Sequence, residues 1–313
     1  MVLPVLLAGC HFAPSAGQSR AWVYERVMAA AVEVLVDNHL SGSGWIADPS
    51  GWVVTAAHMA SARIEVRTSV GRFSAELVAT DRGQDLALLR LPERAQGYPS
   101  VPLASRLPGV GAEIFLVGAP IYRHGVFLPG RVARPTPAFE YLGNEGHYVQ
   151  VIHVAAQTPR GTSGGPWVNG RGEVVGLQSG MMLQDKAAAG IAFLIPVADL
   201  RRLLAVKSDI DTATLGAACE ELSEQSAAVL AKYPPRIEGV ILRRVLEGSP
   251  AHRAGLADGD LVVGSGGRPI RLRDELLSRV RALEPGAKIE LSILDPSAQT
   301  PRTVTVELGS LRR

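Results

Sequence analysis

The sequence has few cysteines, few aromatic residues and little excess charge, and each shortage excludes a class of function. Its two cysteines, Cys10 and Cys219, share no C-x-x-C spacing, which excludes a zinc site or a disulfide framework on count alone. A net charge of +2 at pH 7 and 5% aromatic residues give neither a basic surface nor stacking platforms for nucleic acid. We therefore expect no metal, no cofactor and no nucleic-acid partner.

The chain is instead rich in short β-forming runs separated by turn residues. Its 313 residues favour two domains, and its 33 glycines and 21 prolines favour many strands and turns. A short helix followed by a strand is expected in residues 21–40. Antiparallel β structure arranged as two barrels, rather than βαβ units, is the predicted result. The further strand-like runs are residues 44–47, 52–57, 64–68, 75–79, 86–91, 114–117, 125–132, 148–154, 165–168, 174–178 and 191–196.

Residues 161–167 read Gly-Thr-Ser-Gly-Gly-Pro-Trp, which is a serine surrounded by glycines. Glycine lets the chain turn tightly and lets a substrate carbonyl approach the main chain closely. The amides of Gly161 and Ser163 would then hold a developing oxyanion. The alternative is an ordinary glycine-rich turn.

Two further motifs favour the catalytic interpretation. The apolar run Val-Val-Thr-Ala-Ala ends at His58, and Asp85 stands directly before the apolar run Leu-Ala-Leu-Leu. The order His58, Asp85, Ser163 is that of a chymotrypsin-type triad and differs from those of subtilisin and the α/β-hydrolases. Ser163 would be the nucleophile, His58 the base and Asp85 the residue that orients the imidazole. Asp81 is the alternative acid, although its position is more typical of a turn.

Five segments resemble, in order, the landmarks of HtrA (Deg) serine proteases. They are Gly-Ser-Gly-Trp-Ile at 42–46, Thr-Ala-Ala-His at 55–58, Asp-Leu-Ala-Leu-Leu-Arg at 85–90, the Ser163 motif, and Gly-Ile-Ala-Phe-Leu-Ile-Pro-Val at 190–197. The resemblance covers about residues 22–309. It implies a mostly β fold in which a chymotrypsin-like double β-barrel protease domain is followed by a small α+β PDZ domain. The expected boundaries are a signal and tether at 1–20, the protease domain at 21–205, a helical linker at 206–236 and the PDZ domain at 237–309.

The specificity pocket is expected between two strands that follow the serine motif. No acid lies on these walls, although Asp185 sits in the loop between them, so small or medium apolar substrate side chains are expected. The alternative is barrel core, and both interpretations can hold on alternate strand faces. The predicted wall residues are Val175, Gly176, Leu177, Gln178, Ser179, Ile191, Ala192 and Phe193.

The C-terminal part begins with two predicted helices, one capped by Asp199 and one over residues 219–232 that ends before Pro234. The resemblance to a PDZ domain implies that a peptide C-terminus adds a strand beside a carboxylate-binding loop. That loop is expected at Ile237, Glu238, Gly239 and Val240, where the charge of Glu238 is an unfavourable neighbour for a carboxylate. The alternative is a small domain that binds no ligand.

The N-terminal segment Leu-Ala-Gly-Cys at residues 7–10 resembles a bacterial lipobox, in which the cysteine carries lipid after cleavage. Cys10 would then attach the protein to a membrane through the polar stretch 13–19. No Lys or Arg precedes the apolar run, in contrast to export signals. The alternative is an apolar tail with a free thiol.

These features together predict an ATP-independent serine endopeptidase of the cell envelope that acts on unfolded or regulatory proteins and recognises peptide C-termini. A periplasmic, membrane-anchored lipoprotein is expected. The alternative function is a non-catalytic chaperone or peptide sensor on the same scaffold. In the HtrA family, members that assemble into large cages carry a long insertion at the loop 37–41, which is short here. The resemblance therefore implies a homotrimer of the small regulatory type, with Trp22 and Tyr24 as trimer contacts or, alternatively, as ordinary packing residues.

Overall fold

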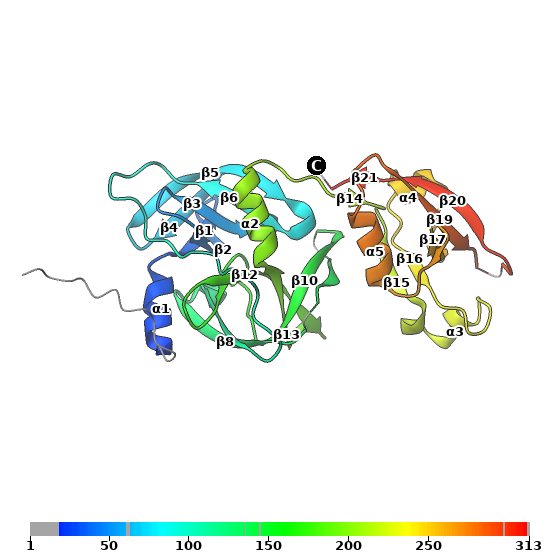
Figure 1. Cartoon of the computed structure of the whole chain (residues 1–313), viewed down its shortest axis with the longest axis horizontal. Helices are drawn as coiled ribbons and strands as arrows, with labels where there is room; N and C mark the ends of the chain where they lie inside the picture. Colours follow the sequence, from blue (N-terminus) through cyan, green and yellow to red (C-terminus); the bar gives the residue numbers. More distant parts are fainter. Residues whose placement is uncertain (1–18, 61–62, 135, 144, 297, 312–313) are drawn as a thin grey trace, which may run out of the picture.

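The computed structural model describes residues 19–60, 63–134, 136–143, 145–296 and 298–311. The predicted lipidation site at Cys10 lies outside these residues. In Figure 1 the chain forms two bodies, an N-terminal body that ends with helix α2 (Val197–Val206) and a C-terminal body built from the remaining residues. No helix among the described residues is both long and apolar enough to span a membrane.

The first barrel of the N-terminal body follows helix α1 (Arg20–Met28). It is closed in the order β1-β2-β3-β6-β5-β4. The two-residue turn Asp37–Asn38 joins its first two strands. Both residues have positive φ, at 48° and 66°, as tight hairpin turns require. The strands are β1 (Ala31–Val36), β2 (His39–Ile46), β3 (Trp52–Ala56), β4 (Ile64–Thr68), β5 (Gly71–Asp81) and β6 (Leu86–Arg90).

The second sheet has the order β13-β12-β11-β7-β8-β10-β9, and an additional pairing of β10 with β13 closes it on itself. The predicted mostly β double-barrel architecture is therefore confirmed. One strand, β9, was not predicted, and it lies outside the closed ring as a hairpin partner of β10. The strands are β7 (Glu113–Gly118), β8 (Val126–Val132), β9 (Ala138–Leu142), β10 (His147–Ala155), β11 (Pro166–Val168), β12 (Val174–Gln184) and β13 (Ala187–Pro196).

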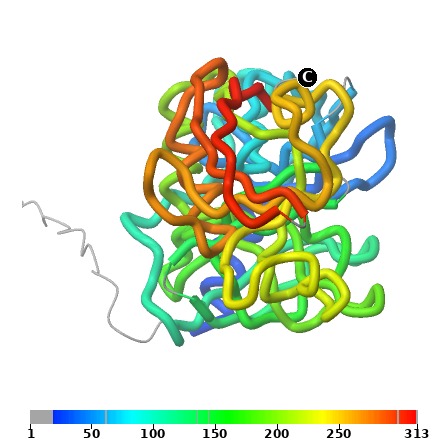
Figure 2. Tube along the Cα trace, turned by 90° about the vertical axis from the view of Figure 1, so that its right-hand side faces the viewer, coloured from blue at the N-terminus to red at the C-terminus, as the bar shows by residue number. Residues whose placement is uncertain are grey.

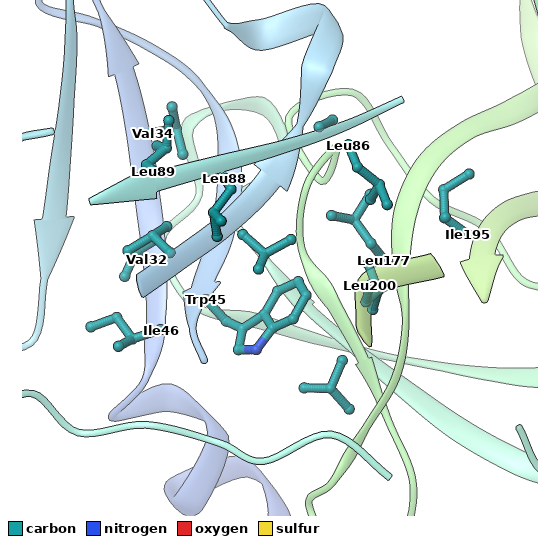
Figure 3. Packing of buried hydrophobic residues seen from close by; sticks show 14 of the residues in the cluster. Val32, Val34, Trp45, Ile46, Leu86, Leu88, Leu89, Leu177, Ile195 and Leu200 are labelled. Carbon is teal, nitrogen blue, oxygen red and sulfur yellow. The ribbon is translucent and has the colours of Figure 1, made fainter. Parts of the chain in front are cut away.

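The two barrels share one apolar core, shown in Figure 3. Trp45 and Leu88 from the first barrel belong to the same buried cluster as Leu177 from the second and Leu200 from α2. Each of these side chains is fully buried, which contributes about 1.5–3 kcal/mol per large apolar side chain. Helix α2 packs against strands of both barrels and thus holds them together.

The expected helix cap at Asp199 is wrong. Strand β13 runs directly into α2, and the N-cap is Pro196, which has an extended backbone at φ −69° and ψ 152°. Asp199 lies inside the first turn of the helix instead.

The C-terminal body is a five-strand path, β15-β16-β17-β19-β20, to which β18 adds at β17. A separate pair, β14 with β21, joins the connecting segment to the end of the chain. The helices α4 (Pro250–Arg253) and α5 (Arg273–Arg281) complete it. The strands are β14 (Ala213–Thr214), β15 (Ala218–Glu221), β16 (Val240–Arg243), β17 (Leu261–Ser265), β18 (Arg268–Pro269), β19 (Lys288–Leu294), β20 (Arg302–Glu307) and β21 (Gly309–Ser310).

The predicted helical linker is corrected by this topology. Residues 218–221 form strand β15, in which Cys219 pairs with Leu242 of β16. Between β15 and β16 the helical structure is limited to a single 3₁₀ turn (Leu222–Glu224) and the four-residue helix α3 (Ala227–Leu230). Pairing with β16 outweighs the local helix preference, because propensity differences amount to only tenths of a kcal/mol per residue. Much of the expected linker therefore belongs to the C-terminal body.

The two bodies touch through helix α5 and the β9–β10 hairpin. Phe139 and Tyr148 of the hairpin belong to the apolar core of the C-terminal body, together with Leu276 of α5. Asp274 of α5 accepts a hydrogen bond from the amide of Phe139 at 3.1 Å and pairs with Arg134 at 3.3 Å. Figure 2, viewed with the C-terminal body toward the viewer, shows it lying over the N-terminal body.

Candidate active site

His58 and Asp85 form a directly bonded pair in the first barrel. His58 sits in a 3₁₀ turn (Ala57–Met59) at the end of β3, and Asp85 stands immediately before β6. The Nδ1 atom of His58 lies 2.9 Å from Oδ2 and 3.0 Å from Oδ1 of Asp85. The same carboxylate accepts the backbone amide of His58 at 2.9 Å. The imidazole is therefore held at Nδ1 by a carboxylate that is itself bonded to the His58 backbone.

Asp85 is buried and adopts a left-handed backbone, at φ 54°, as the cap of the 3₁₀ turn Arg82–Gln84. Asp81 begins that turn, and its carboxylate accepts the amide of Gln84 at 3.1 Å. Of the two acids considered from the sequence, Asp85 is the one that contacts His58, whereas Asp81 caps the turn.

The pKa of His58 reflects two opposing effects. Burial is the largest, and by itself it would lower the pKa of the imidazole. The negative charge of Asp85 and its hydrogen bond favour the imidazolium, and the net result is a pKa raised from the ordinary 6.5. Such a histidine can take up and release a proton near neutral pH.

Ser163 lies in the turn that leads into β11, and this turn is clamped to β2. The amide of Ser43 donates to the carbonyl of Ser163 at 2.8 Å, and the Ser43 hydroxyl donates to the carbonyl of Gly161 at 2.9 Å. Gly164 has φ +81°, and a Cβ there would lie 2.1 Å from the carbonyl of Ser43. The glycine is thus required both by its backbone angle and by the close approach of β2. Sequence reasoning noted Ser43 only as part of a family landmark and missed this clamp.

The peptide bond between Arg160 and Gly161 is held in one orientation. The carbonyl of Arg160 accepts the amide of Ile121 at 2.9 Å. Since the N–H of a trans peptide points opposite to its C=O, the amide of Gly161 faces away from Ile121. Among the described residues, the amides of Gly161 and Ser163 have no hydrogen-bond acceptor. Both donors are therefore available to a bound ligand.

Ser163 does not bond to His58 in this structure. Its hydroxyl donates to the carbonyl of Ser179 at 3.2 Å, and within the described chain no hydrogen bond joins it to the imidazole. The hydroxyl of Ser179 in turn donates to Oδ2 of Asp85 at 2.5 Å. Ser179 thus connects the nucleophile candidate with the acid, and hydrogen bonds between such groups often tighten only with ligand bound.

A cavity of about 780 Å³ opens over these groups. His58 and Ser163 line it, together with Ser179, Phe193 and the β9 residue Glu140. A second cavity, of about 660 Å³, adjoins it on the other side of Gly161. In the described part of the chain, no three His, Cys, Asp or Glu side chains gather as metal ligands would.

The predicted pocket walls divide between cavity and core. Ser179 and Phe193 line the cavity, whereas Val175, Leu177 and Ala192 are fully buried in the apolar clusters. Gly176 and Ile191 do not line the cavity either. The buried side chain of Gln178 accepts the indole N–H of Trp167 at 2.9 Å. In β13 the alternation of strand faces separates Phe193 from Ala192. In β12 a register shift between Gln178 and Gly180 interrupts the alternation, and Ser179 lines the cavity at that point.

The expected peptide-binding loop is not at a sheet edge. Val240 lies in β16, where it pairs with Glu221 on one side and Val262 on the other. The carbonyl of Gly239 accepts the amide of Leu222, and Glu238 forms an exposed ion pair with Arg271 at 2.9 Å. Since Val240 is paired on both sides, the prediction that a peptide strand adds beside Ile237, Glu238, Gly239 and Val240 is wrong. The edge strand here is β15.

Comparisons with known proteins agree with this geometry. The model of the trypsin-like peptidase domain matches residues 42–177. A serine protease named HhoA from Synechocystis sp. is 30% identical over 285 residues, which are 87% of this chain and 71% of HhoA. A relative from Pseudomonas fulva, named "Probable periplasmic serine endoprotease DegP-like", is 30% identical over 86% of this chain and 56% of its own. The chain thus spans a little over half the length of its DegP-like relatives.

Solved structures show the same fold. The HtrA-type protease AlgW with a decapeptide superposes with a TM-score of 0.68 at 20% identity, covering 94% of this chain and 99% of AlgW. A serine endoprotease from Yersinia pestis superposes with a TM-score of 0.64 at 22% identity, covering 95% of this chain and 99% of that one.

Proposed function

The chain belongs to the HtrA family of trypsin-like serine proteases, and from that premise we propose that it is an ATP-independent serine endopeptidase that cleaves unfolded or regulatory proteins. One arrangement carries this proposal. The bonded pair of His58 and Asp85 shares a cavity with Ser163. The amides of Ser163 and Gly161 have no acceptor among the described residues and can bind an oxyanion.

In the proposed mechanism, Ser163 Oγ attacks the scissile carbonyl as Nε2 of His58 takes its proton. Asp85 holds Nδ1–H and stabilises the imidazolium that forms. The amides of Gly161 and Ser163 bind the oxyanion of the tetrahedral intermediate. His58 then protonates the leaving amine, and water, activated by the same imidazole, hydrolyses the acyl-enzyme on Ser163.

Hydrolysis of unfolded casein tests the proposal, with Ser163→Ala as the matched control. The wild-type protein should degrade casein and form a stable adduct with a fluorophosphonate, and the variant should do neither while unfolding at the same temperature. A wild-type protein that suppresses aggregation of casein without cutting it would favour the chaperone alternative.

We further propose that the C-terminal body is a PDZ-type module that binds peptide C-termini. β15 is an edge strand of its sheet, next to α5, and its outer edge is where we expect the peptide to add as a further strand. This replaces the loop expected at residues 237–240. A fluorescent peptide ending in an apolar residue should bind the full chain, and a chain that binds no such peptide would contradict this proposal.

The periplasm is the proposed location, as for the DegP-like relatives by name, with a lipid on Cys10 as the proposed anchor. Intact mass of the membrane-fraction protein should show residues 1–9 missing and a lipid on Cys10.

A homotrimer is proposed through the exposed face around Tyr24, whose ring packs edge-on against Phe127 beside an apolar hollow of about 310 Å³. Light scattering would measure the mass of wild type and of Tyr24→Ala.

A further inference from the structure

The cavity above Ser163 carries a carboxylate that sequence reasoning did not place there. Glu140, in the middle of β9, lines this cavity together with His58 and Ser163. Among the described residues around the cavity it is the only acid. The strand that carries it was not predicted, so the walls were expected to be free of acids.

Glu140 is held in place and still has an open acceptor. Its Oε1 accepts a hydrogen bond from Nε2 of His153 at 2.7 Å, and the two side chains are 19% and 17% exposed. The ring of His153 lies against Phe193, at 5.9 Å between centroids, and Phe193 forms part of the cavity wall. No described residue donates to Oε2 of Glu140. The carboxylate is therefore oriented on one oxygen and free on the other.

The surrounding wall suits a long side chain with a charged end. Leu142, Met182 and Phe193 give the cavity an apolar lining along which an alkyl stem can pack. The other charged side chain at this cavity, apart from His58, is Arg160, which is exposed and is shared with the adjoining cavity. Water screens an exposed charge more strongly than a half-buried one, so the charge of Arg160 is weakened more than that of Glu140.

We propose that Glu140 is a specificity-determining residue that selects a basic substrate side chain, arginine or lysine, at one position near the scissile bond. The inference rests on the proposed protease function and changes the substrate class expected from the strand sequences alone. An arginine can approach the free oxygen with its planar guanidinium, and such charge-assisted hydrogen bonds are about twice as strong as neutral ones.

Arginine and citrulline, its uncharged isostere, provide the test. Nine-residue peptides carry one or the other at each position in turn, and binding is measured by fluorescence anisotropy on the Ser163→Ala protein. Arginine should bind about tenfold more tightly than citrulline at one position, and raising the salt concentration should reduce the preference. In the active enzyme, kcat/KM should show the same ratio.

Two variants distinguish the effect of the Glu140 carboxylate from the effect of removing any nearby negative charge. Glu140→Gln keeps an acceptor for His153 and should remove the arginine preference while citrulline peptides are handled as before. Asp185→Asn removes an exposed acid from the β12–β13 turn, at a backbone φ of 51° that asparagine tolerates, and should leave the preference intact. Equal affinity at every position, or a preference that survives Glu140→Gln, would overturn the inference. Selective binding without any turnover would instead count against the proposed function alone.

Discussion

The hydroxyl of Tyr148 lies between the amide and the carbonyl of Cys219. It accepts the amide at 2.8 Å and donates to the carbonyl at 2.6 Å. Cys219 belongs to β15, so these are backbone groups that point away from β16, along the edge of the sheet. A single side chain from the β9–β10 hairpin thus supplies the hydrogen bonds that one residue of an added strand would supply.

The contact is buried on both sides. Burial raises the pKa of the Tyr148 phenol, and it raises the pKa of the Cys219 thiol to about 12. The same hairpin lines the cavity above Ser163 through Glu140, Tyr141 and Leu142. A peptide that paired with Cys219 of β15 would have to displace the Tyr148 hydroxyl.

Tyr148→Phe tests this relationship. The ring still packs, but the amide and carbonyl of Cys219 lose their partners, which costs about 1–3 kcal/mol for a buried polar group. A peptide that supplies both partners should then bind the C-terminal body about tenfold more tightly, as measured by fluorescence anisotropy. Tyr141→Phe is the control, since its ring packs against Tyr148 and its hydroxyl has no described hydrogen-bond partner. Equal tightening in both variants would contradict the prediction.

The second prediction compares the two acids that precede β6. Asp85→Asn should lower kcat/KM by about 10⁴-fold, because the imidazole loses the charge that fixes its tautomer and stabilises its protonated form. Asp81→Asn should cost far less, since Asp81 caps a turn and does not contact His58. Steady-state kinetics on a chromogenic peptide would rank the two variants, and the opposite ranking would transfer the catalytic role to Asp81.

The pH dependence of kcat/KM provides a third prediction. His58 must be neutral to act as a base, and its pKa is raised, so activity should rise with pH to a midpoint above 6.5. In Asp85→Asn the main charge that raises the pKa of His58 is gone. Burial, the largest influence, then outweighs the remaining charge of Glu145, so the midpoint of the residual activity should fall below 6.5. A midpoint that does not move would show that Asp85 leaves the titration of His58 unaffected.

The barrels, and a site shared by His58, Asp85 and Ser163, could be predicted from the sequence because each of these residues stands in a distinctive local motif. A β-branched run ending in small residues, an acid before an apolar strand and a glycine-rich turn are short-range signals. The preference for Asp85 over Asp81 came from the same kind of signal. None of these inferences required knowledge of which distant strands pair.

The residues that were missed depend on long-range pairing. Glu140 enters the cavity because β9 pairs with β10, and the segment Ala-Phe-Glu-Tyr-Leu does not reveal that pairing by itself. Cys219 becomes an edge-strand residue because β16 lies next to it, against a local preference for helix. The role of Ser43 depends on two hydrogen bonds to a turn that is distant in sequence. Tertiary register, rather than composition, decides all three.

The last prediction concerns stability and pH. Asp199 lies in the first turn of α2, and its pKa is raised to about 6, first by burial and then by the negative charge of Asp81, with Arg202 opposing both. Unfolding exposes the carboxyl to water, where its pKa returns to 3.8. Between these two values the folded state binds more protons than the unfolded state. The contribution of Asp199 to the free energy of unfolding is therefore most favourable below pH 3.8 and is lost as pH rises through 6.

Asp199→Asn should remove this pH-dependent loss of stability, because asparagine carries no ionisable carboxyl group. At pH 7.5 the variant should be more stable than the wild type by roughly 1–3 kcal/mol, since each pKa unit corresponds to about 1.4 kcal/mol. The difference should disappear as the pH approaches 4, where the wild-type carboxyl is neutral in the folded state. Urea unfolding of both proteins across this range measures it, and Glu290→Gln, on an exposed position of β19, controls for the loss of one negative charge. An advantage of Asp199→Asn that stays constant with pH would mean that the burial of a charged Asp199 is not its cause.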